Sequence, residues 1–181
     1  MDKEKAVKAI EDFLDALGED RTREGLKDTP KRVAEAFEEF ISGEGKTAKE
    51  HLEKTFSAQS GDMVLEKDIS FSSTCEHHLM PFFGTVAIAY IPDKKVVGLS
   101  KLARTVEVFA KRLQLQERLT SDIANEIMRC LKPAGVMVVC EAEHTCMTCR
   151  GVKKQGSKTI SYAVCGNFPP EKKAEVFSLL K

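Results

Sequence analysis

The sequence predicts an α+β fold in which two helices interrupt a largely antiparallel sheet. Three observations support this prediction: the first third of the chain has helical periodicity, two apolar strand-like segments follow it, and two further helical stripes separate these segments from a second pair of strands. Strands grouped in blocks, rather than alternating singly with helices, are typical of α+β proteins. The chain of 181 residues is long enough for one domain with a substantial core.

The N-terminal part of the chain is predicted to be helical. Apolar residues repeat at helical spacing over residues 7–17 and again over residues 29–41, and a glycine follows each stripe. The polar stretch that continues to Gly61 is expected to be a short helix or a loop. We therefore expect an N-terminal helical region, 1–60, and a sheet-containing region, 61–181, joined in one integrated domain.

Four strands are predicted in the second region. Alternation and apolar runs place them, with the helices between and after them, in this order: strand to Cys75, strand 83–91, helices 99–113 and 119–131, strands 136–142 and 159–164, and a short helix after Pro170. Such a sheet has two open edges, which can pair with other subunits, so an oligomer is expected.

Composition excludes some classes of partner. The chain has 28 lysines and arginines and 28 aspartates and glutamates, and zero net charge argues against a general nucleic-acid binder. The N-terminus has no signal-peptide core, and no apolar run approaches membrane-spanning length. We therefore expect a cytoplasmic protein without nucleic-acid or membrane partners, whose six cysteines are thiols or metal ligands rather than disulfides.

Two short segments that each follow a predicted strand contain three of the four histidines. They are Cys-Glu-His-His at 75–78 and His-Thr-Cys-Met-Thr-Cys-Arg-Gly at 144–151. Thiolates and neutral imidazoles are preferred zinc ligands, and Cys75 and His78 have the spacing to reach one metal from one turn. Cys146 adds a third ligand if the two strand ends are neighbours. Three ligands leave one tetrahedral position for water, which is the arrangement of a catalytic zinc.

Two histidines, His77 and His144, then remain beside the metal, where imidazoles can act as general acid and base. Spacing alone does not choose between His77 and His78 as the ligand. A closed structural site is the alternative, because Cys149 can complete a four-ligand set with the other candidates. Two unligated histidines are hard to explain beside such a site, so the pattern favours a hydrolase.

The segment 98–104 is a candidate phosphate site. It opens a predicted helix, whose free N-terminal amides favour an anion and which Ser100 is expected to cap. Lys101 and Arg104 lie one turn apart on it. An ordinary capped helix with a solvated basic face is the alternative.

Two further sets of polar residues bear on substrate binding. Arg150 places a guanidinium next to the predicted metal loop. Gln116 and Glu117 come just before an apolar-periodic helix. A carboxylate there can complement the helix dipole or accept hydrogen bonds from the edge of a guanine.

Four motifs in this chain resemble the GTP cyclohydrolase I family and occur in the family's order. They are Cys75-Glu-His-His78, Gly98-Leu-Ser-Lys-Leu-Ala-Arg104, Gln114-Leu-Gln-Glu-Arg-Leu-Thr120 and His144-Thr-Cys-Met-Thr-Cys-Arg-Gly151. The resemblance covers residues 29–168. It implies a tunnelling fold, in which antiparallel sheets from several subunits join into a barrel. It also implies a decamer of two pentamers with active sites at subunit interfaces.

The resemblance implies a reaction and a role for each candidate residue. GTP and water give formate and 7,8-dihydroneopterin triphosphate, the first step of folate and pterin biosynthesis. One Zn²⁺ per subunit is implied, and the roles are as follows: Cys75, His78 and Cys146 as metal ligands; His77 and His144 as the acid–base pair; Gln116 and Glu117 at guanine; Ser100, Lys101, Arg104, Arg150 and Arg32 at the triphosphate.

Two alternatives to a cyclohydrolase are compatible with this sequence. The first is a related tunnelling-fold enzyme that acts on another purine or pterin; one such enzyme, a nitrile reductase with a catalytic cysteine, needs no cysteine–histidine–cysteine metal set. The second, a non-enzymatic structural-zinc protein, binds the metal without turnover.

Overall fold

The computed structural model describes residues 1–181, which divide into two compact units, 1–42 and 43–181. The first unit is a pair of packed helices, α1 (Lys3–Ala16) and α2 (Thr29–Phe40). Both helices lie where the apolar periodicity predicts them. None of the helices in the chain combines the length and apolar character needed to cross a membrane.

The second unit is built on a five-stranded sheet of order β5-β2-β3-β6-β7. Its four long strands pair antiparallel with their neighbours: β2 (Val64–Cys75), β3 (Pro81–Ile91), β6 (Gly135–His144) and β7 (Lys158–Gly166). This arrangement confirms the predicted α+β class. The fifth strand, β5 (Leu113–Gln114), pairs parallel with the end of β2 and is too short for periodicity to reveal.

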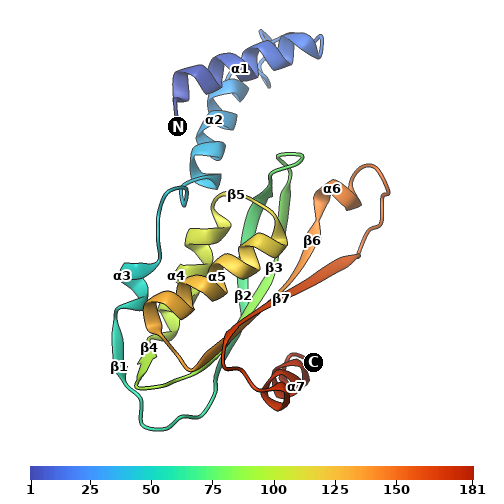
Figure 1. Cartoon of the computed structure of the whole chain (residues 1–181). Coiled ribbons are helices and arrows are strands. Elements are labelled where there is room, and N and C mark those ends of the chain that lie inside the picture. The colour runs from blue at the N-terminus through green and yellow to red at the C-terminus, as the bar shows by residue number, and fades with distance from the viewer. The chain divides into compact units, whose positions relative to one another are not determined.

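Helices cover both faces of this sheet (Figure 1). The helices α4 (Leu99–Ala110) and α5 (Gln116–Leu131) lie in the connection between β3 and β6 and cover one face, and α7 (Pro170–Leu179) packs on the other. Strand side chains alternate between the faces, so Val86 and Ile88 contact the α4–α5 side while Ala87 faces α7. By the same alternation, the even-numbered residues at the ends of β3 and β6 face α5.

The segment after residue 42 packs with the sheet unit. It contains α3 (Lys49–Leu52) and β1 (Thr55–Ser57), and β1 pairs with β4 (Lys95–Val97). The backbone N–H of Ala48 donates to the buried carboxylate of Glu126 on α5. The boundary between the compact units therefore falls at residue 42, whereas the expected helical region extended to residue 60. Long-range strand pairing and a buried hydrogen bond, which periodicity does not reveal, account for the difference.

Candidate active site

The candidate metal ligands lie at one end of the sheet. The strands β2 and β6 are both antiparallel to β3, so they run in the same direction and end together. Cys75 is the last residue of β2, and His78 lies in the turn that leads to β3. Cys146 lies in α6 (Thr145–Thr148), a one-turn helix directly after β6 that the sequence analysis does not predict. The order of the strands thus brings together two motifs that are about 70 residues apart in the sequence.

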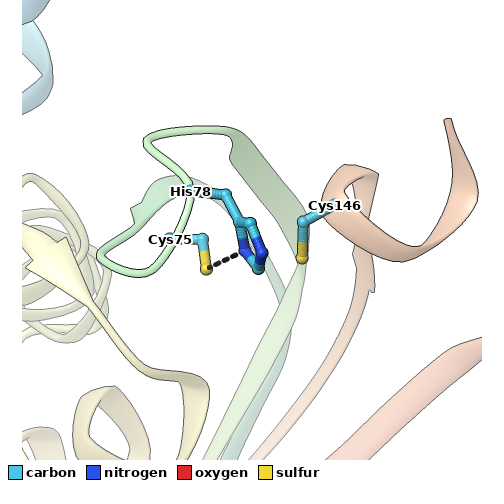
Figure 2. Close-up of side chains that lie close together, drawn as sticks. All are labelled: Cys75, His78 and Cys146. Carbon is cyan, nitrogen blue, oxygen red and sulfur yellow. Dashed lines mark hydrogen bonds between the residues drawn. The ribbon is translucent and has the colours of Figure 1, made fainter. Parts of the chain in front are cut away.

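The three side chains form a compact group (Figure 2). One ligand atom each of Cys75, His78 and Cys146 lies within 4.8 Å of the other two, and Nδ1 of His78 is 3.9 Å from Sγ of Cys75. Figure 2 shows the side chains of the β2–β3 turn and of α6 pointing toward one another. Two thiols and one imidazole are a donor set that suits zinc. The group can therefore bind one metal ion.

Cys149 stands outside this group. Its exposed thiol donates a hydrogen bond to the backbone oxygen of Thr145, at 2.8 Å. The closed four-ligand site of the structural alternative is thus not assembled. Within the group, burial raises the pKa of the Cys146 thiol and the adjacent Cys75 raises it further. A metal must therefore displace a proton when it binds to Cys146.

The ring of His144 is held from two directions. Phe82, its cross-strand partner in β3, stacks on it with the ring centroids 4.8 Å apart and the planes at 3°. Its Nε2 atom lies 2.7 Å from Oε1 of Gln116. Burial lowers the pKa of His144, and the carboxylate of Glu117 opposes that effect. His144 is therefore a neutral imidazole at neutral pH, able to accept a proton.

Gln116 and Glu117, the first two residues of α5, have different environments. Gln116 is only 1% exposed, and its Nε2 donates to the backbone oxygens of Cys140 and Thr159, each at 3.0 Å. Its amide is thus occupied within the chain. Glu117 is exposed, and its charge acts on His144. Of the two residues expected at guanine, only Glu117 therefore exposes its polar group to a ligand.

His77 and Arg150 complete this end of the sheet. His77 is exposed, and its ring meets that of His78 edge to face with the centroids 6.2 Å apart. Nη1 of Arg150 lies 3.3 Å from Nε2 of His78. Both residues therefore lie beside the metal-binding group in the structure.

One ion pair at the site is not predicted from the sequence. The guanidinium of Arg118, in the first turn of α5, donates to the carboxylate of Glu76 in the metal-binding turn. Both residues lie inside motifs quoted above, but no local pattern pairs residues 42 positions apart. The pair ties the metal-binding turn to the helix that begins with Gln116 and Glu117.

The basic segment at the start of α4 is distant from the metal-binding group of the same chain. This helix begins near Tyr90, whose hydroxyl accepts a hydrogen bond from the last residue of β4. It ends near β5, which pairs with Thr74 and Cys75. A 12-residue helix is about 18 Å long, so Lys101 is separated from Cys75 by most of that length.

Ser100 and Arg32, two further residues expected at the triphosphate, lie in different parts of the chain. The prediction that Ser100 caps α4 is wrong: Gly98 is the N-cap, and no side chain caps the helix. The helix begins two residues earlier than the cap prediction requires, so Ser100 falls within its exposed first turn. Arg32 belongs to the N-terminal unit, where it is exposed on α2 and lies 3.4 Å from Asp28.

Comparison with known protein families is decisive for the identity of this chain. The profile described as GTP cyclohydrolase I matches residues 6–181, nearly the whole sequence. The chain belongs to the GTP cyclohydrolase I family. The family resemblance of the four motifs is thereby confirmed.

Individual family members are similar over almost their full length. GTP cyclohydrolase 1 of Clostridium perfringens (strain 13 / Type A) is 56% identical over 99% of this chain and 98% of its own. The protein of the same name from Carboxydothermus hydrogenoformans is 62% identical over 93% of this chain and 88% of its own. Among solved structures, the apo form of the archaeosine synthase QueF-Like has a TM-score of 0.47 and 20% identity, and covers 61% of this chain and 100% of its own.

Proposed function

We propose that this family member is a zinc-dependent GTP cyclohydrolase I. It hydrolyses the imidazole ring of guanine at C8, and GTP and water give formate and 7,8-dihydroneopterin triphosphate. The observation that carries this proposal is the meeting of Cys75, His78 and Cys146 with His144 at one end of the sheet.

The metal-binding group has the chemistry of a catalytic zinc site. Two thiolates and an imidazole satisfy three positions, and Cys149 is engaged elsewhere. When bound with three protein ligands, zinc keeps a position for water and lowers the pKa of that water to about 7. We propose one ion per subunit.

The protein groups around the metal can handle the protons of the reaction. C8 of guanine is a poor electrophile until N7 is protonated, and we assign that protonation to His144, whose neutral ring first takes up a proton from water at its free nitrogen and then passes it to N7. Its ring is held by Phe82 and Gln116, which keep it in one orientation. The exposed His77 is suited to the later proton transfers of ring opening and closure. The carboxylate of Glu117 can accept hydrogen bonds from the guanine edge.

We further propose that each active site is shared between subunits of a homo-oligomer, a decamer of two pentamers. Arg150 lies beside the metal-binding group, but Ser100 and Lys101 lie in the first turn of α4, at the far end of that helix, and Arg104 lies in its middle. Ser100 and Lys101 can contact the same triphosphate only if a neighbouring subunit supplies them, and we assign Arg104 to that subunit with them. Arg32 is assigned to the triphosphate as well. The outer edge of β7 has no strand partner in the chain, which favours pairing between subunits.

A turnover assay tests the proposed reaction. Purified, zinc-loaded protein is incubated with GTP, and formate and the fluorescent neopterin formed after oxidation are measured. Both products are expected from the native protein, and both are lost in Cys146→Ala, which removes a ligand. His144→Ala is the matched variant, expected to retain zinc and lose formate release. Folded, zinc-loaded native protein that yields neither product would overturn the proposal.

A further inference from the structure

A chain of buried hydrogen bonds lies behind His144. The hydroxyl of Thr120 donates to the backbone oxygen of Gln116, at 2.7 Å, and lies 2.7 Å from the hydroxyl of Ser161. Because the single proton of Thr120 is used, Ser161 must donate to Thr120. The oxygen of Ser161 is then left as an acceptor that faces Nε2 of Gln116, at 3.1 Å. The two N–H groups of Gln116 are thus shared among three acceptors, none of which has a proton to donate back.

The same contacts determine which way the amide of Gln116 points. Its nitrogen lies 3.0 Å from the backbone oxygens of both Cys140 and Thr159, and these oxygens can only accept. If the amide were flipped, its own oxygen would face two carbonyl oxygens in a buried site, with no donor to replace the lost hydrogen bonds. The nitrogen therefore faces the sheet, and the oxygen Oε1 faces His144.

This orientation decides the form of the His144 ring. The distance of 2.7 Å between Oε1 of Gln116 and Nε2 of His144 is a hydrogen bond, and an amide oxygen carries no proton. Nε2 must therefore be the donor. Stacking on the fully buried Phe82 holds the plane of the ring.

We propose that Gln116 is a positioning residue that keeps His144 in the Nε2–H tautomer, so that Nδ1 is the nitrogen that exchanges protons with the substrate. The inference deepens the proposed function and rests on it for the identity of the substrate. It gives Gln116 a role behind the histidine, whereas the family resemblance implies contact with guanine.

The two roles of Gln116 differ in their kinetic consequences. Gln116→Met keeps the length of the side chain and removes every hydrogen bond, including the one that selects the tautomer. General acid–base groups contribute about 10²- to 10⁴-fold, and a misoriented ring loses part of that factor. We expect kcat to fall about 10- to 100-fold with KM for GTP and zinc content nearly unchanged. A rise in KM with kcat unchanged would indicate direct contact with guanine and would overturn the proposal.

A spectroscopic measurement on the resting protein is independent of turnover. Solid-state ¹⁵N NMR of zinc-loaded, histidine-labelled protein at about pH 8, where imidazoles are neutral, distinguishes the two tautomers of each ring. The signals of His144, identified by their loss in His144→Asn, are expected in the Nε2–H form. Finding His144 of the native protein in the Nδ1–H form would overturn the proposal, even if Gln116→Met does not fold.

A matched variant separates the tautomer effect from a general loss of packing. Gln114 is equally buried, and its amide contacts Phe109 and Asp122 instead of His144. Gln114→Met should leave the His144 tautomer unchanged, while Gln116→Met should give a mixture. Equal effects of the two variants would contradict a specific role for Gln116. If the tautomer result holds but the native protein releases no formate from GTP, the proposed function fails and the positioning role remains.

Discussion

At the scale of single residues, the same thiol side chain has different chemistry at different positions. Cys140 lies in the middle of β6, facing the helices, and burial raises its pKa to about 12. Cys149 is exposed on the loop after α6. Since the thiolate is the reactive form, burial and the raised pKa both lower the reactivity of Cys140, whereas the thiol of Cys149 is accessible to reagents.

We therefore expect selective alkylation of the native, zinc-loaded protein. Iodoacetamide at about pH 8 should modify Cys149 and leave Cys140 unmodified until the protein is unfolded. Peptide mapping by mass spectrometry measures both sites in one sample. Modification of Cys140 at the rate of Cys149 would contradict the burial described above.

The raised pKa of Cys146 also predicts how metal affinity depends on pH. With the pKa above its ordinary value, the thiol is protonated at neutral pH, and binding a metal releases that proton. Affinity should therefore fall as the pH is lowered, by about tenfold per pH unit for each proton released. Competition with a chromophoric zinc chelator between about pH 6 and pH 8 measures this dependence. A constant affinity over the range would contradict it.

At the scale of elements, β3 and β6 approach each other too closely at Gly84 for any side chain. A Cβ atom there would lie 1.9 Å from the backbone oxygen of Glu141 and 2.7 Å from the Cα of Ala142. Gly84 is two residues from Phe82, and these strands carry both rings of the Phe82–His144 stack. A change in the distance between β3 and β6 at Gly84 would therefore also move the stacked rings of Phe82 and His144.

We predict that Gly84→Ala destabilises the protein by about 1–3 kcal/mol, the usual range for overpacking, because the two backbones must separate. Urea unfolding measures the change, and kcat should fall as well because the stacked ring of His144 shifts. Gly61→Ala is the control, since a Cβ at Gly61 meets nothing within 4 Å. It should alter stability by less than about 0.5 kcal/mol. Equal effects of both substitutions would show that the contact at Gly84 is unimportant.

At the scale of the whole molecule, the metal-binding group and the basic first turn of α4 lie at opposite ends of that helix within one chain. The metal-binding group lies where β2 ends, near the C-terminal end of α4, whereas Lys101 lies in the first turn of that helix. The side chains of Ile160 and Tyr162 on the edge strand β7 are 60% and 59% exposed. An apolar edge strand of this kind favours association with another copy.

Mixing two inactive variants tests whether subunits share sites. Cys146→Ala lacks a metal ligand, and Lys101→Ala lacks a cation expected to hold the triphosphate. If the subunits are dissociated, mixed in equal amounts and reassembled, about a quarter of the sites should combine two intact halves and regain activity. Light scattering checks that assembly has occurred. An assembled mixture without activity would show that each site belongs to one chain.

Much of the fold is readable from local pattern. Periods of 3.6 and 2 predict the long helices and the four long strands, because burial of one face imposes these repeats. Residue chemistry likewise indicates a metal site formed by Cys75, Cys146 and one of the two adjacent histidines, and in the structure His78 is the one grouped with the two cysteines. The short elements α6, β1, β4 and β5 contain too few residues to show a period. The boundary at residue 42 depends on pairing between distant segments.

The sequence by itself determined the fold class, the donor set for a metal and the family. Only the tertiary structure decided which distant residues meet: Glu76 with Arg118, and His144 with Gln116 and Phe82. It also decided that Lys101 lies far from the metal ligands of its own chain. The physical reason is that periodicity records which face of an element is buried, whereas a hydrogen bond between two elements depends on how they are placed in space.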